Sequence, residues 1–221
     1  MILVSGAAGK TGQAVVGALV ARGARVRGLV RRAEQESVVR KAGGAEVVVG
    51  DMLAGEAWER GVAGTTAVYH IPPNMHPDEL KIGQLAIAAA GAAKVRCFGY
   101  HSVLWPQTEA MPHHWQKLRV EELLLRSGLA YVMVQPSAYM QNLAAMRARV
   151  VQEGVLAAPY GAESRLSLVD LGDVAEVVAR LLVDEGLWYG SYGLCGTRGL
   201  SQREVAAEWG AVLGRVVRAE R

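Results

Sequence analysis

Residues 1–12 read MILVSGAAGKTG, a short apolar run followed by glycines at positions 6, 9 and 12. The run Met1–Ser5 predicts a buried strand, and apolar residues at helical spacing over Thr11–Arg22 predict a helix directly after it. Small residues at such a junction allow a tight turn, a close approach of backbone amides to a pyrophosphate, and close packing of helix on strand. The motif therefore predicts a dinucleotide-binding βαβ unit, with a plain strand-to-helix turn as the alternative.

The phosphates of the dinucleotide are expected at the start of this helix, because a helix N-terminus carries partial positive charge. Three glycines at this junction lower the helix propensity of the segment. A plain strand-to-helix turn would gain nothing from that cost. The candidate phosphate-binding residues are Gly6, Ala8, Gly9, Lys10, Thr11 and Gly12.

Short β-branched runs continue to alternate with helical patterns along the chain. The predicted strands cover residues 25–30, 46–49, 67–71, 95–99 and 131–135, and the predicted helices cover 33–42, 78–92 and 113–127. This alternation is typical of an α/β protein with a doubly wound parallel sheet, so we expect a Rossmann fold with its dinucleotide-binding core over residues 1–136. Residues 137–221 are expected to complete this core and to form a small C-terminal substrate lobe. Helices are predicted there at 172–183 and 201–213, around a short strand at 192–195.

The composition favours one α/β domain with a sizeable core. The 221 residues are 51% hydrophobic and 20% charged, which is too apolar for a disordered chain. The net charge of +3 is too small to imply nucleic-acid binding. No apolar run approaches the roughly 18 residues of a membrane span, and no signal peptide is visible, so we expect a cytoplasmic protein that contacts no membrane.

The cysteines and histidines form no metal-binding pattern. Cys97 and Cys195 are the two cysteines and make no CxxC pair, which excludes a disulfide framework and a cysteine-rich zinc site. His101, His113 and His114 have no accompanying acid at ligand spacing. We therefore expect no metal.

Arginines follow the second predicted strand at the position that selects between NAD(H) and NADP(H). An NAD site places an acid roughly 20 residues after the glycine loop, where it binds the ribose 2′-hydroxyl. Here Arg31 and Arg32 occupy that position, and residues 22–41 hold seven Arg or Lys against two Glu. A guanidinium pairs with a 2′-phosphate that a carboxylate would repel. The arginines predict NADP(H) as the cofactor, with a solvated surface pair as the alternative.

Asp51 and Met52 follow the third predicted strand and are assigned to the adenine. Asp51 can accept a hydrogen bond from the adenine amine, and Met52 can cover the ring. The alternative for Asp51 is a turn residue after Gly50.

The ends of the fourth, fifth and sixth strands are expected to face the nicotinamide. They carry His70, Ile71, Pro72, Ser102, Pro136 and Ser137. The helix that Pro112 opens places His113 and Lys117 at i and i+4, so both face one side of that helix.

Several segments together carry a resemblance to a known family. They are residues 6–12, 31–32, 50–52, 100–103, 111–122, 135–142 and 169–175. On these segments the chain resembles the NmrA-like branch of the atypical short-chain dehydrogenases/reductases. The resemblance implies an NADP(H)-preferring Rossmann fold with a small substrate lobe. Members of the family include quinone and azo-type reductases, and also redox sensors that bind NADP without turnover.

The resemblance also implies roles at the site. Lys117 falls where the wider superfamily keeps the lysine of its YxxxK pair, which hydrogen-bonds the nicotinamide ribose. Ser102 falls near the catalytic serine, and the tyrosine position is His113. In the segment that lines the nicotinamide, the implied contacts are Pro136 and Tyr139.

His113 leaves two functions open. The first is an NADPH-dependent oxidoreductase that transfers hydride to a small carbonyl, quinone or similar unsaturated acceptor. A helix N-terminus and Lys117 lower the pKa of His113, and a neutral imidazole still polarises a carbonyl by donating one N–H. The second function is a non-catalytic NADP(H) sensor, in which His113 belongs to a polar first helical turn without chemistry. An isomerase or dehydratase is a weaker third interpretation, against which the missing tyrosine also argues.

The partners follow from these functions. An oxidoreductase needs a small-molecule substrate, whereas a homodimer and a regulatory protein partner both stay open. A flat cleft for an aromatic acceptor can be lined by Trp105, Trp115, Trp188, Tyr139 and Tyr189. Ordinary packing is the alternative for each of these rings.

Overall fold

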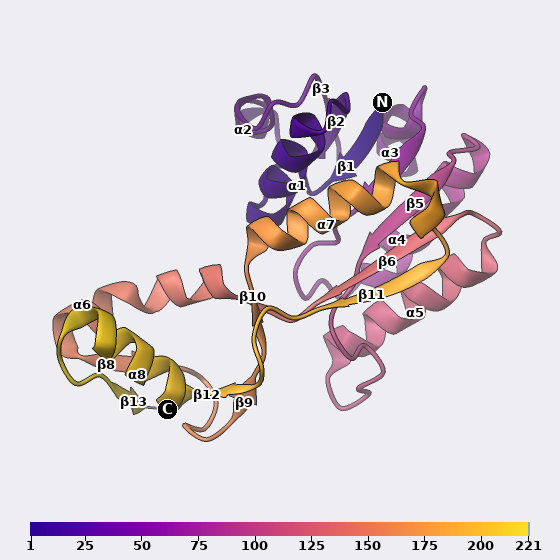
Figure 1. Cartoon of the computed structure of the whole chain (residues 1–221). Helices are drawn as coiled ribbons and strands as arrows, with labels where there is room; N and C mark the ends of the chain where they lie inside the picture. The colour runs from indigo at the N-terminus through magenta and orange to yellow at the C-terminus, as the bar shows by residue number, and fades with distance from the viewer. Residues whose placement is uncertain (221) are drawn as a thin grey trace. The chain divides into compact units, whose positions relative to one another are not determined.

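A seven-stranded sheet forms the centre of the first of two compact units in this computed structural model, which describes residues 1–220 (Figure 1). Its strands are β1 (Ile2–Ser5), β2 (Val26–Val30), β3 (Glu46–Val49), β4 (Ala67–His70), β5 (Cys97–His101), β6 (Tyr131–Pro136) and β11 (Gly190–Leu194). The order is β11-β6-β5-β4-β1-β2-β3, and β1 to β6 pair in parallel. This confirms the doubly wound α/β fold. Successive strands reverse their direction of addition between β1 and β4, which is where such sheets bind ligands.

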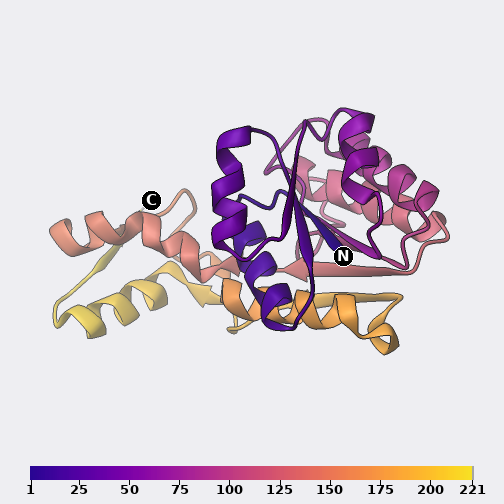
Figure 2. The ribbon, with the colours of Figure 1, turned by 90° about the horizontal axis from the view of Figure 1, so that it is seen from above.

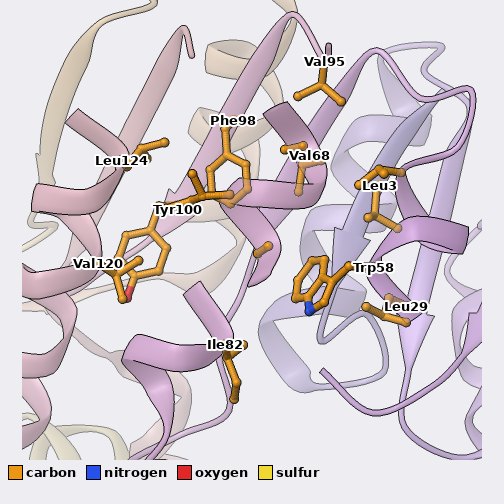
Figure 3. Packing of buried hydrophobic residues seen from close by; sticks show 14 of the residues in the cluster. Leu3, Leu29, Trp58, Val68, Ile82, Val95, Phe98, Tyr100, Val120 and Leu124 are labelled. Carbon is orange, nitrogen blue, oxygen red and sulfur yellow. The ribbon is translucent and has the colours of Figure 1, made fainter. Parts of the chain in front are cut away.

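Helices α3 (Gly55–Val62), α4 (Glu79–Ala92) and α5 (Pro112–Arg126) pack on one face of this sheet. Figure 3 shows Trp58, Ile82 and Val120 from these helices among sheet residues such as Leu3 and Phe98. Trp58 and Phe98 have no exposed surface. This core fixes α4 and α5 against the ends of β4 and β5.

The opposite face carries α1 (Lys10–Ala21), α2 (Glu36–Lys41) and α7 (Leu171–Val183), as Figure 2 shows from above. Two glycines of the sheet make room for them. A Cβ on Gly28 would lie 2.7 Å from the side chain of Val39 in α2, and one on Gly99 would lie 3.0 Å from Leu182 in α7. The helices therefore approach the sheet closely on this side.

Most predicted elements lie within two residues of their observed bounds, and the exceptions have local causes. Helix α3 was not predicted, because its eight residues mix charges with Gly61. The segment at 33–42 begins as a 3-10 turn (Ala33–Gln35) before α2. Strand β5 runs on to His101 because its pairing with β6 continues there, where His101 lies opposite Val134.

The second unit comprises residues 136–171 and 194–220 and has a core of its own. Its helical segments are a 3-10 stretch (Met140–Met146), α6 (Arg147–Glu153) and α8 (Gln202–Leu213). Three short strand pairs join β7 (Ala138–Tyr139) to β10 (Leu168–Val169), β8 (Val155–Ala157) to β13 (Arg218–Glu220), and β9 (Arg165–Leu166) to β12 (Leu200–Ser201). Ser201 caps α8 and exchanges hydrogen bonds with Glu204, as a capping box does.

Throughout residues 1–220, each helix is too short or too polar to cross a membrane.

Candidate active site

The glycine loop between β1 and α1 is too crowded for larger residues at two positions. Gly6 has a φ of +64°, and a Cβ there would lie 2.8 Å from the carbonyl oxygen of Ile71. A Cβ on Gly12 would lie 2.2 Å from the carbonyl oxygen of Gly6, inside any allowed contact. The loop therefore packs against its own helix and against the end of β4, as a phosphate-binding turn requires.

Gly9 differs from the other two glycines. It has an ordinary φ of −70° and precedes the first residue of α1, where no side chain caps the helix. A Cβ there would meet only the carbonyl oxygen of Gly6, at 3.3 Å. The space in front of Gly9 is thus open, and the positive end of α1 faces it.

A cavity of about 420 Å³ lies in front of the loop. Four segments of the first unit converge on it: the glycine loop, the ends of β2 and β3, and the turn that follows β4. The lining residues that the sequence predicted are Gly6, Ala8, Gly9, Lys10, Thr11, Gly12, Arg31, Asp51, Met52, Ile71 and Pro72. The structure therefore brings most of the predicted dinucleotide contacts into one cavity.

Arg31 lines this cavity, whereas Arg32 does not. Both backbone amides donate to the same side-chain oxygen of Gln35, at 3.1 Å for Arg31 and 3.0 Å for Arg32. Gln35 also lines the cavity. It fixes the turn that carries the two arginines.

Asp51 has the turn role that the sequence allowed, and its contact with adenine stays a prediction. Its Oδ1 accepts from the backbone N–H of Leu53 at 2.9 Å, as a turn residue does. Its Oδ2 lies 3.6 Å from Nε of Arg31, and the residue lines the cavity. Met52 lines the cavity as well, and its carbonyl oxygen accepts from the indole N–H of Trp58 at 2.8 Å.

The assignment of the His70 side chain to the cofactor is wrong. His70 has no exposed surface, and its Nδ1 lies 2.8 Å from Oγ of Ser5. Burial lowers its pKa to about 3, so the imidazole is neutral near pH 7. Ser5 in turn accepts from the backbone N–H of Ile71 at 3.1 Å. The pair ties the ends of β1 and β4 together behind the glycine loop.

Lys117 lies on the inner side of α5 and is largely buried. Its Nζ donates to Oε1 of Glu79 at 2.8 Å and lies 3.5 Å from the carbonyl oxygen of His101. The hydroxyl of Tyr100 donates to the same Oε1 at 2.7 Å. Burial lowers the pKa of Lys117, and Glu79 acts against that change.

Ser102 follows β5 and is buried beside Glu121, one turn beyond Lys117 on α5. Gln135 donates to the Glu121 carboxylate at 2.9 Å. Burial raises the pKa of Glu121, while the Ser102 hydroxyl, the Gln135 amide and Lys117 oppose the rise. Ser102 is only 3% exposed. Its catalytic role stays a prediction.

His113 lies one turn before Lys117 and is partly exposed. Its pKa is lowered, first by burial and then by the positive charges of His114 and Lys117. The His114 ring stands edge-on to the His113 ring, and its Nδ1 lies 3.1 Å from the carbonyl oxygen of Trp105. His113 is thus the more accessible end of a column on α5 that continues through Lys117 to Glu121.

Pro136, Ser137 and Tyr139 belong to the second unit. The backbone N–H of Ser137 donates to the carbonyl of Leu194 at 2.9 Å, and Tyr139 pairs with Val169. Their contacts with a nicotinamide stay predictions.

Two of the rings that were predicted to line an aromatic cleft lie away from the predicted nicotinamide position. Trp188 and Tyr189 lie at the wrong end of the sheet, because the Tyr189 N–H donates to the carbonyl of Tyr131, where β6 begins. The nicotinamide was predicted at the other ends of these strands. Trp105 follows β5 instead, is 65% exposed, and has a φ of +57°.

Residues that the sequence did not reveal are Gln35, His76 and Glu79. His76 lines the cavity, and its Nδ1 accepts from the backbone N–H of Asp78 at 3.1 Å. In the sequence, Asp78 and Glu79 form an acid pair of the kind typical of a helix start, which does not mark Glu79 for another role. Within residues 1–220, no group of three His, Cys, Asp or Glu side chains could hold a metal ion.

Comparisons with known proteins agree with this architecture. A (4-alkanoyl-5-oxo-2,5-dihydrofuran-3-yl)methyl phosphate reductase of Streptomyces griseus is 32% identical over 221 residues, covering 100% of this chain and 76% of that protein. An NAD(P)H azoreductase of Xenophilus azovorans is 30% identical over 223 residues, covering 99% and 76%. The crystal structure of an NADPH-dependent quinone oxidoreductase from Escherichia coli, complexed with NADPH, superposes with a TM-score of 0.89 at 22% identity. That match covers 100% of this chain and 78% of the other. The profile of the NmrA-like family matches residues 1–221, and the chain belongs to the NmrA-like family.

Proposed function

We propose that the protein is an NADPH-dependent oxidoreductase that transfers hydride to a small carbonyl, quinone or similar unsaturated acceptor. The observation that carries the proposal is the cavity of about 420 Å³, which is lined by both the open glycine loop and Arg31. Arg31 stands at the position after β2 where an NAD site has an acid. The relatives include an NAD(P)H azoreductase and a (4-alkanoyl-5-oxo-2,5-dihydrofuran-3-yl)methyl phosphate reductase, which supports the same reaction class.

The residues of the cavity fit NADP(H). The start of α1 and the open side of Gly9 suit the pyrophosphate, since a side chain there would fill the approach. Arg31, with Arg32 beside it, suits the 2′-phosphate. Asp51 and Met52 suit the adenine.

When bound, the cofactor supplies the hydride. Lys117 would orient the nicotinamide ribose by donating a hydrogen bond, and Ser102 follows directly after β5. His113, whose lowered pKa favours the neutral imidazole, donates its remaining N–H to the oxygen of a carbonyl acceptor. A quinone needs this help less, because water can protonate the reduced oxygen.

The test is NADPH oxidation with a panel of quinones, azo dyes and aldehydes. We expect loss of the reduced-nicotinamide absorbance with at least one acceptor class, and a faster rate with NADPH than with NADH. A protein that binds NADPH but oxidises it with no acceptor would contradict the proposal.

That outcome would favour a non-catalytic NADP(H) sensor. One observation supports this second candidate: a histidine occupies the position of the proton-donating tyrosine. A sensor would change its protease sensitivity or its oligomeric state on NADP(H) binding, with no turnover.

A further inference from the structure

One carboxylate oxygen in the core of the first unit accepts hydrogen bonds from two sides. Oε1 of Glu79 accepts from Nζ of Lys117 at 2.8 Å and from the hydroxyl of Tyr100 at 2.7 Å. The three residues come from α4, α5 and β5. The Glu79 side chain is 1% exposed and that of Lys117 is 14% exposed. A buried ion pair therefore joins two helices next to the end of β5.

Such a pair is not explained by stability. Removing two charges from water costs several kcal/mol per ion, and apolar side chains of similar size often stabilise a core as well or better. The other carboxylate oxygen, Oε2 of Glu79, is buried and has no hydrogen-bond partner within residues 1–220. The arrangement thus carries an energetic cost that a packing role alone would not require.

The groups around Lys117 leave Glu79 as its main counter-charge. His101 on β5 and His70 on β4 are buried, and burial lowers the pKa of each to about 3, so both are neutral near pH 7. On α5 itself, Glu121 is engaged by Gln135, and His113 is partly exposed. Of the described residues, Glu79 alone forms an ion pair with Lys117.

We propose that Glu79, held in place by Tyr100, is the positioning residue for Lys117: it keeps the ammonium group fixed and charged at the end of β5, where the proposed function places the nicotinamide ribose. The inference rests on the proposed function, because the ribose contact of Lys117 is part of that function. Glu79 is the first residue of α4, where the helix dipole also stabilises its negative charge. Tyr100 remains a donor, since burial and Glu79 raise its pKa well above the usual value.

The titration midpoint of Lys117 distinguishes the two roles of Glu79, because a purely structural role of Glu79 would leave this midpoint unchanged. Burial lowers the pKa of Lys117, and the carboxylate of Glu79 opposes that change. With Glu79→Gln the shape of the side chain is kept, but only the weaker effect of the Glu121 charge still opposes burial. We expect the titration midpoint of Lys117 to fall by about 1–3 pH units, the usual effect of losing an opposite charge at this distance.

The experiment is an NMR titration of the protein with isotope-labelled lysine, without cofactor. The chain has five lysines, and Lys117→Met identifies the signal of Lys117 by its disappearance. Glu122→Gln is the matched control, because Glu122 is an exposed carboxylate on α5 that pairs with Arg119 and Arg126. Its removal should leave the Lys117 midpoint unchanged. An unchanged midpoint in folded Glu79→Gln would overturn the proposal.

NADPH binding separates this proposal from the proposed function. Lys117→Met should weaken NADPH binding about tenfold to a hundredfold, the value of a charged hydrogen bond. Glu79→Gln should weaken NADPH binding by the same factor at pH values above the lowered midpoint of Lys117. At pH values below that midpoint, where Lys117 is charged again, the NADPH affinity should return to that of the parent. Full NADPH affinity in Lys117→Met would reject the ribose contact, whereas a pH-independent affinity in Glu79→Gln would reject the positioning role.

A milder variant covers the case in which Glu79→Gln does not fold. Glu79→Asp keeps the negative charge, but its side chain is one methylene shorter and holds the carboxylate farther from Lys117. We expect a smaller fall of the Lys117 midpoint and an intermediate loss of NADPH affinity. A parent-like midpoint together with parent-like affinity in Glu79→Asp would overturn the proposal.

Discussion

Nε of Arg31 lies 3.6 Å from Oδ2 of Asp51 at the edge of the cavity, so the guanidinium that we assign to the 2′-phosphate rests beside a carboxylate. Both side chains are substantially exposed, at 79% and 48%. A 2′-phosphate would therefore compete with Asp51 for Arg31 and would also be repelled by Asp51. The preference between NADPH and NADH depends on the balance of these two charges.

Asp51→Asn should strengthen NADPH binding by roughly fivefold, because an exposed charge at this range is worth about 1 kcal/mol. NADH has no 2′-phosphate, so its affinity should change little. Calorimetric titration at low and high salt checks this, since screening should shrink the gain. A loss of affinity for both cofactors would instead show that the adenine needs the charged form of Asp51.

Gly9→Val should abolish NADPH binding while the protein stays folded. The backbone at Gly9 suits any residue, and its Cβ would meet only one atom, at 3.3 Å. The added methyl groups would fill the pyrophosphate approach. Circular dichroism and NADPH titration test this, and retained affinity in the folded variant would mean that the loop binds no phosphate.

Gly12→Ala is the matched contrast to that variant. Its Cβ would lie 2.2 Å from the carbonyl oxygen of Gly6. It should therefore lower the free energy of unfolding, by about 1–3 kcal/mol or more.

His113→Phe should leave NADPH affinity nearly intact and lower the rate with aldehydes by about 100-fold, because the developing alkoxide loses the N–H that stabilises it. The loss with quinones should be smaller, because water can supply the proton. In the parent, the titration of His113 should appear in kcat/KM below its ordinary pH range, since its pKa is lowered. An unchanged aldehyde rate across pH 5–9 would remove His113 from the chemistry.

Acid should destabilise the first unit through its buried histidines. The pKa values of His70 and His101 are lowered by burial to about 3. The unfolded chain therefore binds more protons below about pH 6.5, and stability present above that pH is lost as the pH falls toward 3. We expect a loss of about 2 kcal/mol per histidine between pH 7 and pH 5, measured by urea unfolding.

His70→Asn is the control for this pH effect. Asparagine can still hydrogen-bond to Ser5 but does not titrate. The loss between pH 7 and pH 5 should fall to about half. An unchanged pH slope would show that His70 is not the group responsible.

The cavity could be predicted from the sequence because its contacts are local. The glycines, Arg31 and Asp51 each follow a strand directly, and parallel strands bring such ends together. His70 was misassigned because the alternation of strand side chains does not say which face its terminal residue takes. Gln35 was missed for a different reason: its role depends on a turn that no periodic pattern marks.

The contact of Glu79 with Lys117 could not be predicted from the sequence. Its partner Lys117 is 38 residues away, and the contact exists only because α4 and α5 pack side by side. The acid at the start of α4 had a sufficient local explanation as a helix-start residue. The prediction that Trp188 and Tyr189 line the acceptor cleft was wrong for a similar reason. Only the position of β11 beside β6 shows which end of the sheet these two residues occupy.

The central claim is that the cavity holds NADP(H) through the arginines after β2. Calorimetric titration of NADPH and NADH into the parent and into the Arg31→Ala/Arg32→Ala double variant tests it most directly. We predict NADPH binding about 10- to 100-fold tighter than NADH in the parent, and loss of most of that preference in the variant. Equal affinity of the parent for both cofactors, or a preference that survives in the variant, would contradict the account.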